Sequence, residues 1–378
     1  MKAIWTEMKK RTTFVRTSAL ALSLGLVAGY FPTSSLLSIQ ARSANAGAAP
    51  ALPPSAMPFY KDKTVRVIVP VSPGGSFDVW SRILARHMGK HLPGNPTFIV
   101  QNMSGGGGVV GANYLYGVAK PDGLTIGTIS PNGYLNQIME KLEVKYDWAK
   151  YSWIGATATT HELLYIRADT GYRTLEDVIK AATPPMCGSI GVGTTGSFIP
   201  RLLQELFGAR FKIVEGYPGG VESDMAVARG EVNCRATSIM TYFGREPTKG
   251  WHEQGFTRVL IQTGEKRHPA LPDTPTVWEL AERKNLPNGD RRVMEVILAG
   301  GSFGVPFVAP PGISADHLKL LRQAFMKTLE DEEFRAEVAR VHGMEIRPVS
   351  GHELEELARR IIDLPPNVAK HLQRFLSS

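Results

Sequence analysis

Two glycine-rich segments hold the residues whose types and spacing best suit a chemical task. The first, SPGGSFD, runs from Ser72 to Asp78, and the second, GVGTTGS, runs from Gly191 to Ser197. Each follows a strand-like stretch and precedes a helical pattern, so several backbone N–H groups would point at one place beside the positive end of a helix dipole. Such a turn binds an anion without a cationic side chain. The pair predicts a ligand whose anionic groups are held between two parts of the fold.

The glycine-rich sequences also permit other interpretations. Gly106 to Gly111 (GGGVVG) and Gly191 to Gly196 (GVGTTG) both match the dinucleotide fingerprint G-x-G-x-x-G. Glu215 follows the strand after the second copy, where an acid would bind a ribose, whereas only Ser130 stands in that place after the first. An exported protein would also meet little nicotinamide cofactor. Tight turns that bind nothing are the third interpretation.

Residues suited to catalysis form no convincing group. The sequence contains neither H-E-x-x-H nor G-x-x-x-x-G-K-[ST]. Ser76, Ser130 and Ser197 fit helix caps or anion ligands better than nucleophiles. His161 and Glu162 are the local candidates for an acid–base pair, with a surface or core role as the ordinary alternative. These patterns indicate no catalytic site, and we predict no cofactor and no metal.

The N-terminus has the pattern of an export signal. A basic start up to Arg16 precedes an apolar run over residues 17–31, and Ala44 to Ala46 offers a small-x-small cleavage site. The run is short for a membrane span. We predict a Sec-type signal peptide over 1–46, a flexible leader over 47–58 and a periplasmic location. A retained membrane anchor is the alternative.

Charge indicates which partners are unsuitable, and the cysteines indicate a possible disulfide. The chain has a net charge of +8, but six of its 43 Lys and Arg residues and only one of its 35 acids precede residue 47. No basic stripe with interleaved aromatic residues occurs, so we predict no nucleic-acid partner. Cys187 and Cys234 are the two cysteines. In an exported protein they would form either a disulfide or two buried free thiols, and the sequence leaves both open.

The remaining sequence alternates strand and helix patterns, which favours α/β architecture with mostly parallel sheets. Strands are expected at 64–69, 97–101, 124–129, 163–166, 211–214, 232–237 and 258–262, and an extended segment at 304–309. Helices are expected at 79–92, 110–119, 174–181, 222–229, 314–329, 332–342 and 351–375. Thr174 and Asp177 have the spacing of a capping box. Residues 284–290 are polar and are expected to form a loop.

Several short motifs, in order from Tyr60 almost to the C-terminus, resemble those of the tripartite tricarboxylate transporter substrate-binding proteins, also called Bug receptors. The motifs are RVIVPxxPGGSxD (66–78), NxxGxGGxxG (102–111), PDG (121–123), GxxxxGS (191–197), YxG (217–219), GxV (230–232), PxLPDxPT (269–276) and GxxxxAPxG (304–312).

The resemblance implies a non-enzymatic receptor with a two-lobe, type II periplasmic-binding-protein (Venus-flytrap) fold. Lobe 1 would comprise residues 59–158 and 304–378, and lobe 2 residues 159–303, with two mixed, mostly parallel sheets. The receptor would bind a small organic carboxylate, aromatic or dicarboxylic among the options, and deliver it to membrane permease subunits, as a monomer. A ligand-sensing domain for a membrane signalling partner and an exported enzyme are the alternatives.

The resemblance also assigns ligand-binding residues by position. Those of lobe 1 would be Pro73, Gly74, Gly75, Ser76, Phe77, Asp78, Ser130 and Asn132, and those of lobe 2 would be Thr194, Thr195, Gly196, Ser197 and Tyr217. Asp78 has an equally good structural role in the first turn of its helix. Arg235 interrupts an apolar strand and, if it faces the ligand, is the cation for a carboxylate. Phe77 and Arg235 depart from the family pattern and favour an aromatic or more anionic ligand.

Overall fold

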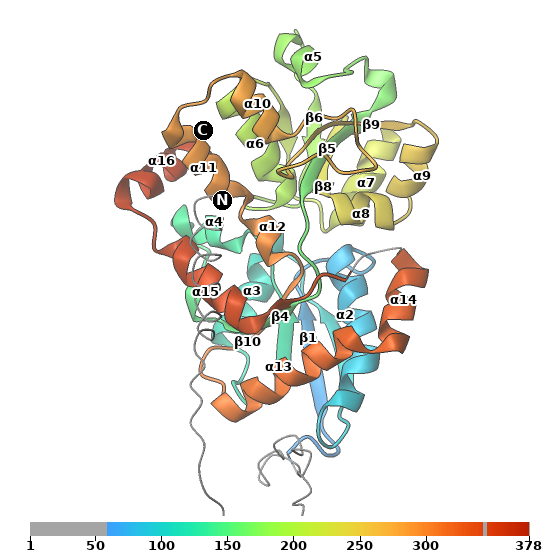
Figure 1. The fold of residues 1–378 in the computed structure, drawn as a ribbon, viewed down its shortest axis with the longest axis vertical. Coiled ribbons are helices and arrows are strands. Elements are labelled where there is room, and N and C mark those ends of the chain that lie inside the picture. Colours follow the sequence, from blue (N-terminus) through green and yellow to red (C-terminus); the bar gives the residue numbers. More distant parts are fainter. Residues whose placement is uncertain (1–58, 343–345, 378) are drawn as a thin grey trace, which may run out of the picture. The chain divides into compact units, whose positions relative to one another are not determined.

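The computed structural model describes residues 59–342 and 346–377, which belong to one compact unit (Figure 1). The predicted signal peptide and leader lie outside the described residues. Among the described residues no helix combines the length and apolar character that a membrane crossing requires.

The first of two β-sheets, sheet A, has six strands in the order β11-β4-β10-β3-β1-β2. Its strands are β1 (Thr64–Val69), β2 (Thr97–Asn102), β3 (Thr125–Thr128), β4 (Ser152–Ala156), β10 (Pro306–Ala309) and β11 (Val349–Ser350). Strand β1 runs parallel to both β2 and β3, whereas β10 lies antiparallel between β3 and β4. A late segment of the chain therefore completes a sheet begun by the earliest strands.

The second sheet, sheet B, has five strands in the order β7-β6-β8-β5-β9. Its strands are β5 (Glu162–Arg167), β6 (Met186–Gly188), β7 (Lys212–Val214), β8 (Cys234–Ser238) and β9 (Thr257–Gln262). Strand β6 is parallel to β7 and β8, but β5 is antiparallel to both of its neighbours, β8 and β9. Both sheets are mixed, as predicted. Most strands of each sheet share one direction, and β10 and β5 are each antiparallel to both of their neighbours.

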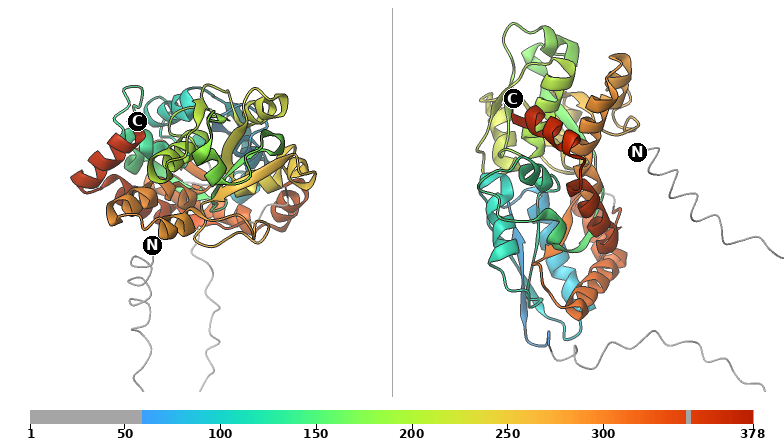
Figure 2. Two further views of the ribbon diagram at one scale, coloured as in Figure 1. Left: turned by 90° about the horizontal axis from the view of Figure 1, so that it is seen from above. Right: turned by 90° about the vertical axis from the view of Figure 1, so that its left-hand side faces the viewer.

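Helices pack on both faces of each sheet (Figure 2). On sheet A, α2, α13 and α14 pack together, while α3 and α15 contribute to the core on the other face. On sheet B, α6, α10 and α11 cover one face and α7, α8 and α9 the other. The helices are α2 (Ser76–His87), α3 (Val109–Gly117), α4 (Gly133–Ile138), α5 (Leu175–Lys180), α6 (Thr195–Phe207), α7 (Gly220–Arg229), α8 (Ile239–Gly244), α9 (Thr248–Glu253), α10 (Val277–Arg283), α11 (Asn288–Leu298), α12 (Gly300–Phe303), α13 (Ala315–Glu330), α14 (Glu332–His342), α15 (Gly351–Ile362) and α16 (Pro366–Ser377).

Local sequence signals explain several element boundaries. Thr174 and Asp177 form the expected capping box at the start of α5. Two expectations were wrong. The polar segment 284–290 is not one loop, because α11 begins at Asn288. The single helix expected over 351–375 is broken between α15 and α16, where the consecutive prolines Pro365 and Pro366 oppose continuation of the first helix.

Two chain segments connect the sheets. Residues 157–161 lead from β4 to β5, and Gly304 and Val305 lead from α12 back to β10. The segments are hydrogen-bonded to each other, with Thr157 N 3.2 Å from Val305 O and Val305 N 3.2 Å from Ala158 O. A Cβ on Gly304 would lie 1.6 Å from Ala158 O, so the crossing requires glycine at this position. The lobe boundaries at 158 and 304 stay a prediction.

Candidate functional site

A cavity of about 120 Å³ lies where residues attached to the two sheets meet. Its wall includes the start of α2, Ser130, residues 189–190 and 194–196, the end of β8, and Glu162 and Gly304 beside the crossing segments. The volume exceeds that of several water molecules, which suits a small organic molecule. Among the predicted ligand-binding residues, those that line the cavity are Gly75, Ser76, Phe77, Ser130, Thr194, Thr195, Gly196 and Arg235.

The N-terminus of α2 forms one wall. Gly75 is the N-cap residue, so the N–H groups of the first turn at Ser76 and Phe77 have no acceptor within the helix. Asp78 does not line the cavity, because it is 2% exposed and turned into the protein. It accepts hydrogen bonds of 2.9 Å from Gly74 N, Arg82 Nε and Asn102 Nδ2. Burial opposes ionisation of Asp78, but these hydrogen bonds outweigh it and lower its pKa. Asp78 therefore shapes the glycine-rich turn from behind.

The N-terminus of α6 forms a second wall. Thr194 is the N-cap residue, and its hydroxyl group donates a 2.7 Å hydrogen bond to Gly191 O. Gly196 packs so tightly that an added Cβ would lie 3.0 Å from Gly188 O. By the rule of helix ends, the N–H groups of Thr195 and Gly196 have no acceptor inside α6. Both residues line the cavity, so the start of α6 with its free donors forms part of the wall.

Several predicted ligand residues lie elsewhere. Pro73 and Gly74 are exposed, and Asn132 is buried against Gly300, where an added Cβ would clash with its side-chain oxygen. The Ser197 hydroxyl group donates to Glu215 at 2.8 Å, which also engages the acid that the dinucleotide interpretation requires. None of these residues lines the cavity, nor does Tyr217.

A buried ion cluster supplies the positive charge of the site. Asp224, on α7, is fully buried and accepts hydrogen bonds from the guanidinium groups of Arg235 and Arg245 and, at 2.7 Å, from the Tyr165 hydroxyl group. Both arginines line the cavity. Within the described part of the chain, Arg245 Nε has no hydrogen-bond partner. Two guanidinium groups against one carboxylate leave one net positive charge on this side of the cavity.

Sequence reasoning found Arg235 but missed Asp224 and Arg245. Arg235 lies on β8, Asp224 lies on α7, and Arg245 directly follows α8. No short sequence motif contains all three. Arg245 follows the α8 sequence IMTYFG, which has no sign of a binding loop. The available signal was the arginine within an apolar strand, because a buried guanidinium group requires an acid nearby.

The cavity also contains an acid. Glu162, at the start of β5, is 3% exposed and lines the wall. Its Oε2 accepts a 3.1 Å hydrogen bond from the Thr263 hydroxyl group, and burial raises the pKa of Glu162 to about 7. The neighbouring His161 is exposed and does not line the cavity. The two residues therefore do not form the acid–base pair that the sequence suggested.

One further sequence pattern is typical of a catalytic nucleophile. Gly300 to Gly304 (GGSFG) matches the nucleophile motif G-x-S-x-G. The motif requires a turn between a strand and a helix. Here Ser302 lies inside the short helix α12, which follows α11 and not a strand. The structural context of a nucleophile is therefore missing.

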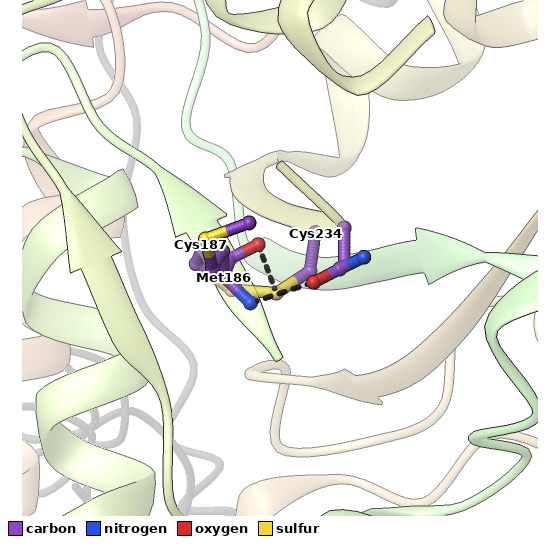
Figure 3. Close-up of a disulfide and its surroundings, with 4 residues drawn as sticks. Met186, Cys187 and Cys234 are labelled. Atoms are coloured by element: carbon purple, nitrogen blue, oxygen red, sulfur yellow. Dashed lines mark hydrogen bonds between the residues drawn. A yellow bond between two sulfur atoms is a disulfide. The ribbon is translucent and has the colours of Figure 1, made fainter. Parts of the chain in front are cut away.

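A disulfide joins strands β6 and β8 of sheet B (Figure 3). Cys187 of β6 and Cys234 of β8 are paired in register, and their sulfur atoms are bonded, with a Cα–Cα distance of 4.4 Å. The structure thus decides between the two alternatives in favour of the bridge. Gly188 and Arg235 are the next residues on the two strands. The bond therefore fixes the strand ends that carry the arginine and the start of the second glycine-rich segment.

Direct contacts between the two glycine-rich sides close the cavity. Ser76 Oγ lies 2.7 Å from Thr241 Oγ1, and the Ser72 hydroxyl group donates to Glu222 at 2.9 Å. A Cβ on Gly107 would lie 3.2 Å from Val192 O. The enclosed cavity depends on these close approaches.

Comparison with known proteins agrees with this architecture. Residues 80–363 match the profile of the "Tripartite tricarboxylate transporter family receptor". The "UPF0065 protein in gbd 5'region" of Cupriavidus necator is 29% identical over 315 residues, covering 79% of this chain and 86% of the relative.

Solved structures show the same fold. The periplasmic binding protein BugD has a TM-score of 0.66 and 21% identity, covering 84% of this chain and 98% of that one. The MatC protein of Rhodopseudomonas palustris, solved with bound malate, has a TM-score of 0.64 and 19% identity, covering 83% and 99%. The family is one of transporter receptors, which are binding proteins and not enzymes. The chain belongs to the tripartite tricarboxylate transporter receptor family.

Proposed function

We propose that this receptor captures a small organic carboxylate in the periplasm and delivers it to the membrane permease subunits of a tripartite tricarboxylate-type transporter. The observation that carries the proposal is the enclosed cavity between the N-termini of α2 and α6, with Arg235 and Arg245 in its wall. Two sets of backbone donors and a net positive charge converge there. This combination suits an anion and offers little to a neutral apolar molecule.

The donors divide between the two sheets, which suggests how capture works. The α2 terminus follows β1 of sheet A, whereas α6 and both arginines are attached to sheet B. A carboxylate contacts both sets only when the sheets approach, so the ligand stabilises the closed arrangement and the permease would recognise it. The contact between Ser76 and Thr241 belongs to that arrangement.

Known relatives support a carboxylate with a second functional group. MatC was solved with malate, and another R. palustris protein with adipate. Both molecules are dicarboxylates. In this chain Phe77 adds an aromatic surface to the wall, which favours a ligand with an apolar or ring portion.

Calorimetric titration of residues 47–378 with mono-, di- and tricarboxylates, aromatic ones included, tests the proposal. At least one carboxylate should bind and remain chemically unchanged. Arg245→Gln should weaken that binding about tenfold or more, because a charge-assisted hydrogen bond contributes about 1.5–3 kcal/mol. Asp224 keeps Arg235 as its partner in this variant, so folding should survive.

Arg229→Gln is the matched control, because Arg229 lies on α7 but is 55% exposed and pairs with Glu231 outside the cavity. It should bind like the wild type. The proposal fails if no carboxylate binds, or if Arg245→Gln and Arg229→Gln have equal effects.

A further inference from the structure

The carboxyl group of Glu162 is an acid in the cavity wall that the binding of a carboxylate does not explain. Its residue is 3% exposed, and its Oε2 atom accepts from the Thr263 hydroxyl group at 3.1 Å. The same hydroxyl oxygen accepts from Glu162 N at 2.8 Å, so the backbone and side chain both anchor to Thr263. Among the described residues, no ion pair or further side-chain hydrogen bond involves Glu162. Its second oxygen therefore has no protein donor.

Strand register separates this acid from the cations of the cavity. Tyr165 pairs with Arg235, whereas Glu162 pairs with Ser238 at the far end of the same ladder. Successive side chains of a strand point to opposite faces, so residues three apart lie on opposite faces. Arg235 thus reaches Asp224 of α7, and Glu162 points to the face of α12, where its Oε2 would lie 3.8 Å from a Cβ on Gly301. The cavity has a cationic side and a separate acidic side.

The other groups around Glu162 do not supply the missing donor. Tyr134 of α4 is an ionisable neighbour of Glu162, but its hydroxyl group donates to Val296 O at 2.7 Å. His161, the residue before Glu162, is exposed and does not line the cavity. The second oxygen of Glu162 is not fully buried, so as an acceptor without a protein donor it is open to the contents of the cavity. A solute that fills the cavity can satisfy it.

We propose that Glu162 determines which carboxylates this receptor accepts, by requiring a hydrogen-bond donor on the solute, either a hydroxyl or an ammonium group. This inference rests on the function proposed above, because the solute's carboxylate occupies the side with Arg235 and Arg245. The substrate class is then a hydroxy- or amino-carboxylate, and an unsubstituted acid of the same length is a poor ligand.

Two series of matched acids test this inference by calorimetry at pH 8. Succinate, malate and aspartate differ at one carbon by hydrogen, hydroxyl and ammonium, and propionate, lactate and alanine differ in the same way. We expect a substituted acid of at least one series to bind about tenfold or more tightly than its unsubstituted parent, as a hydrogen bond to a charged group predicts. Glu162→Ala should abolish that difference.

Glu162→Gln distinguishes the two donors. Glutamine keeps a neutral acceptor for a hydroxyl group but removes the negative charge that an ammonium group requires, so it should weaken amino acids more than hydroxy acids. Glu265→Gln, at an exposed acid in the loop after β9, is the control and should change nothing.

The outcomes separate the two proposals. If the parent acids bind as tightly as the substituted ones, or if Glu162→Ala keeps the preference, the inference about Glu162 is wrong and the carboxylate receptor stands. If no acid of either series and none of the wider panel binds, both proposals fall.

Discussion

Replacing Glu162 with glutamine should make this receptor more stable in alkaline solution and leave it unchanged in acid. The two side chains have nearly the same shape, and glutamine can also accept the hydrogen bond from Thr263. The difference between them is the negative charge. In the wild type this charge must form on a side chain in the cavity wall, in a residue that is only 3% exposed.

The size of the effect follows from the pKa of Glu162. Burial raises this pKa from 4.5 in the unfolded chain to about 7 in the folded one. Between those values the folded chain retains a proton that the unfolded chain has lost, so the free energy of unfolding falls as the pH rises. One pKa unit corresponds to about 1.4 kcal/mol, so the full fall is about 3 kcal/mol. Stability from this group is complete below pH 4.5 and is lost once the pH passes 7.

Urea unfolding of residues 47–378, followed by tryptophan fluorescence at pH 4, 6 and 8, measures the difference. We expect equal free energies of unfolding for the wild type and Glu162→Gln at pH 4. At pH 8 the variant should be more stable by about 3 kcal/mol, which corresponds to about 4 °C in melting temperature for a chain of this length. Glu265→Gln, at an exposed position, should match the wild type throughout.

A constant difference between the wild type and Glu162→Gln at all three pH values would refute this reasoning. It would mean that the Glu162 carboxyl group is solvated in solution and that burial does not control its ionisation. The requirement for a donor on the solute would then lose its physical basis as well.

Three further perturbations have defined outcomes. Replacing both cysteines with serine removes a cross-link between residues 47 apart and should lower the free energy of unfolding by about 4 kcal/mol; an unchanged urea midpoint would contradict this. Asp224→Asn leaves two buried guanidinium groups without a counter-charge, so a thermal melt should show a loss of about 3–5 kcal/mol, whereas Asp169→Asn, at a side chain that is 60% exposed, should show little. Gly304→Ala would place a Cβ 1.6 Å from Ala158 O, while Gly171→Ala, also at positive φ, meets open space. The first should unfold at a clearly lower temperature than the second, and equal losses would show that the close approach at the crossing is not limiting.

Local sequence was sufficient for the elements whose signals are themselves local. The strand predicted at 64–69 matches β1, and the capping box starts α5 where its spacing indicated. The turn before α2 was also recognised from its glycines. In these cases the residues that decide the structure lie within a few positions of one another.

Long-range contacts decided what the sequence could not show. Strand β4 has the sequence SWIGA, and it is a strand because β10, about 150 residues later, pairs with it. Asp78 has the residue type and sequence position of a ligand contact, but its carboxylate accepts hydrogen bonds from Arg82 and Asn102 instead. The pairing of Arg245 with Asp224 depends on how α7 and α8 pack, which no periodicity reports. The fold was therefore more predictable than the membership of the cavity wall.

Two glycines lie where residues attached to sheet A contact residues attached to sheet B. They offer a way to measure the energetic contribution of closure separately. A Cβ at Gly193 would lie 2.3 Å from the Asn136 side chain, and one at Gly219 would lie 2.1 Å from Ser72 Oγ. Neither glycine lines the cavity, so alanine at either position acts as a wedge that leaves the ligand's partners intact. The apparent affinity then falls in proportion to the fraction of molecules that can still close. A graded wedge series would thus divide the binding free energy into the part that comes from closing and the part that comes from contact.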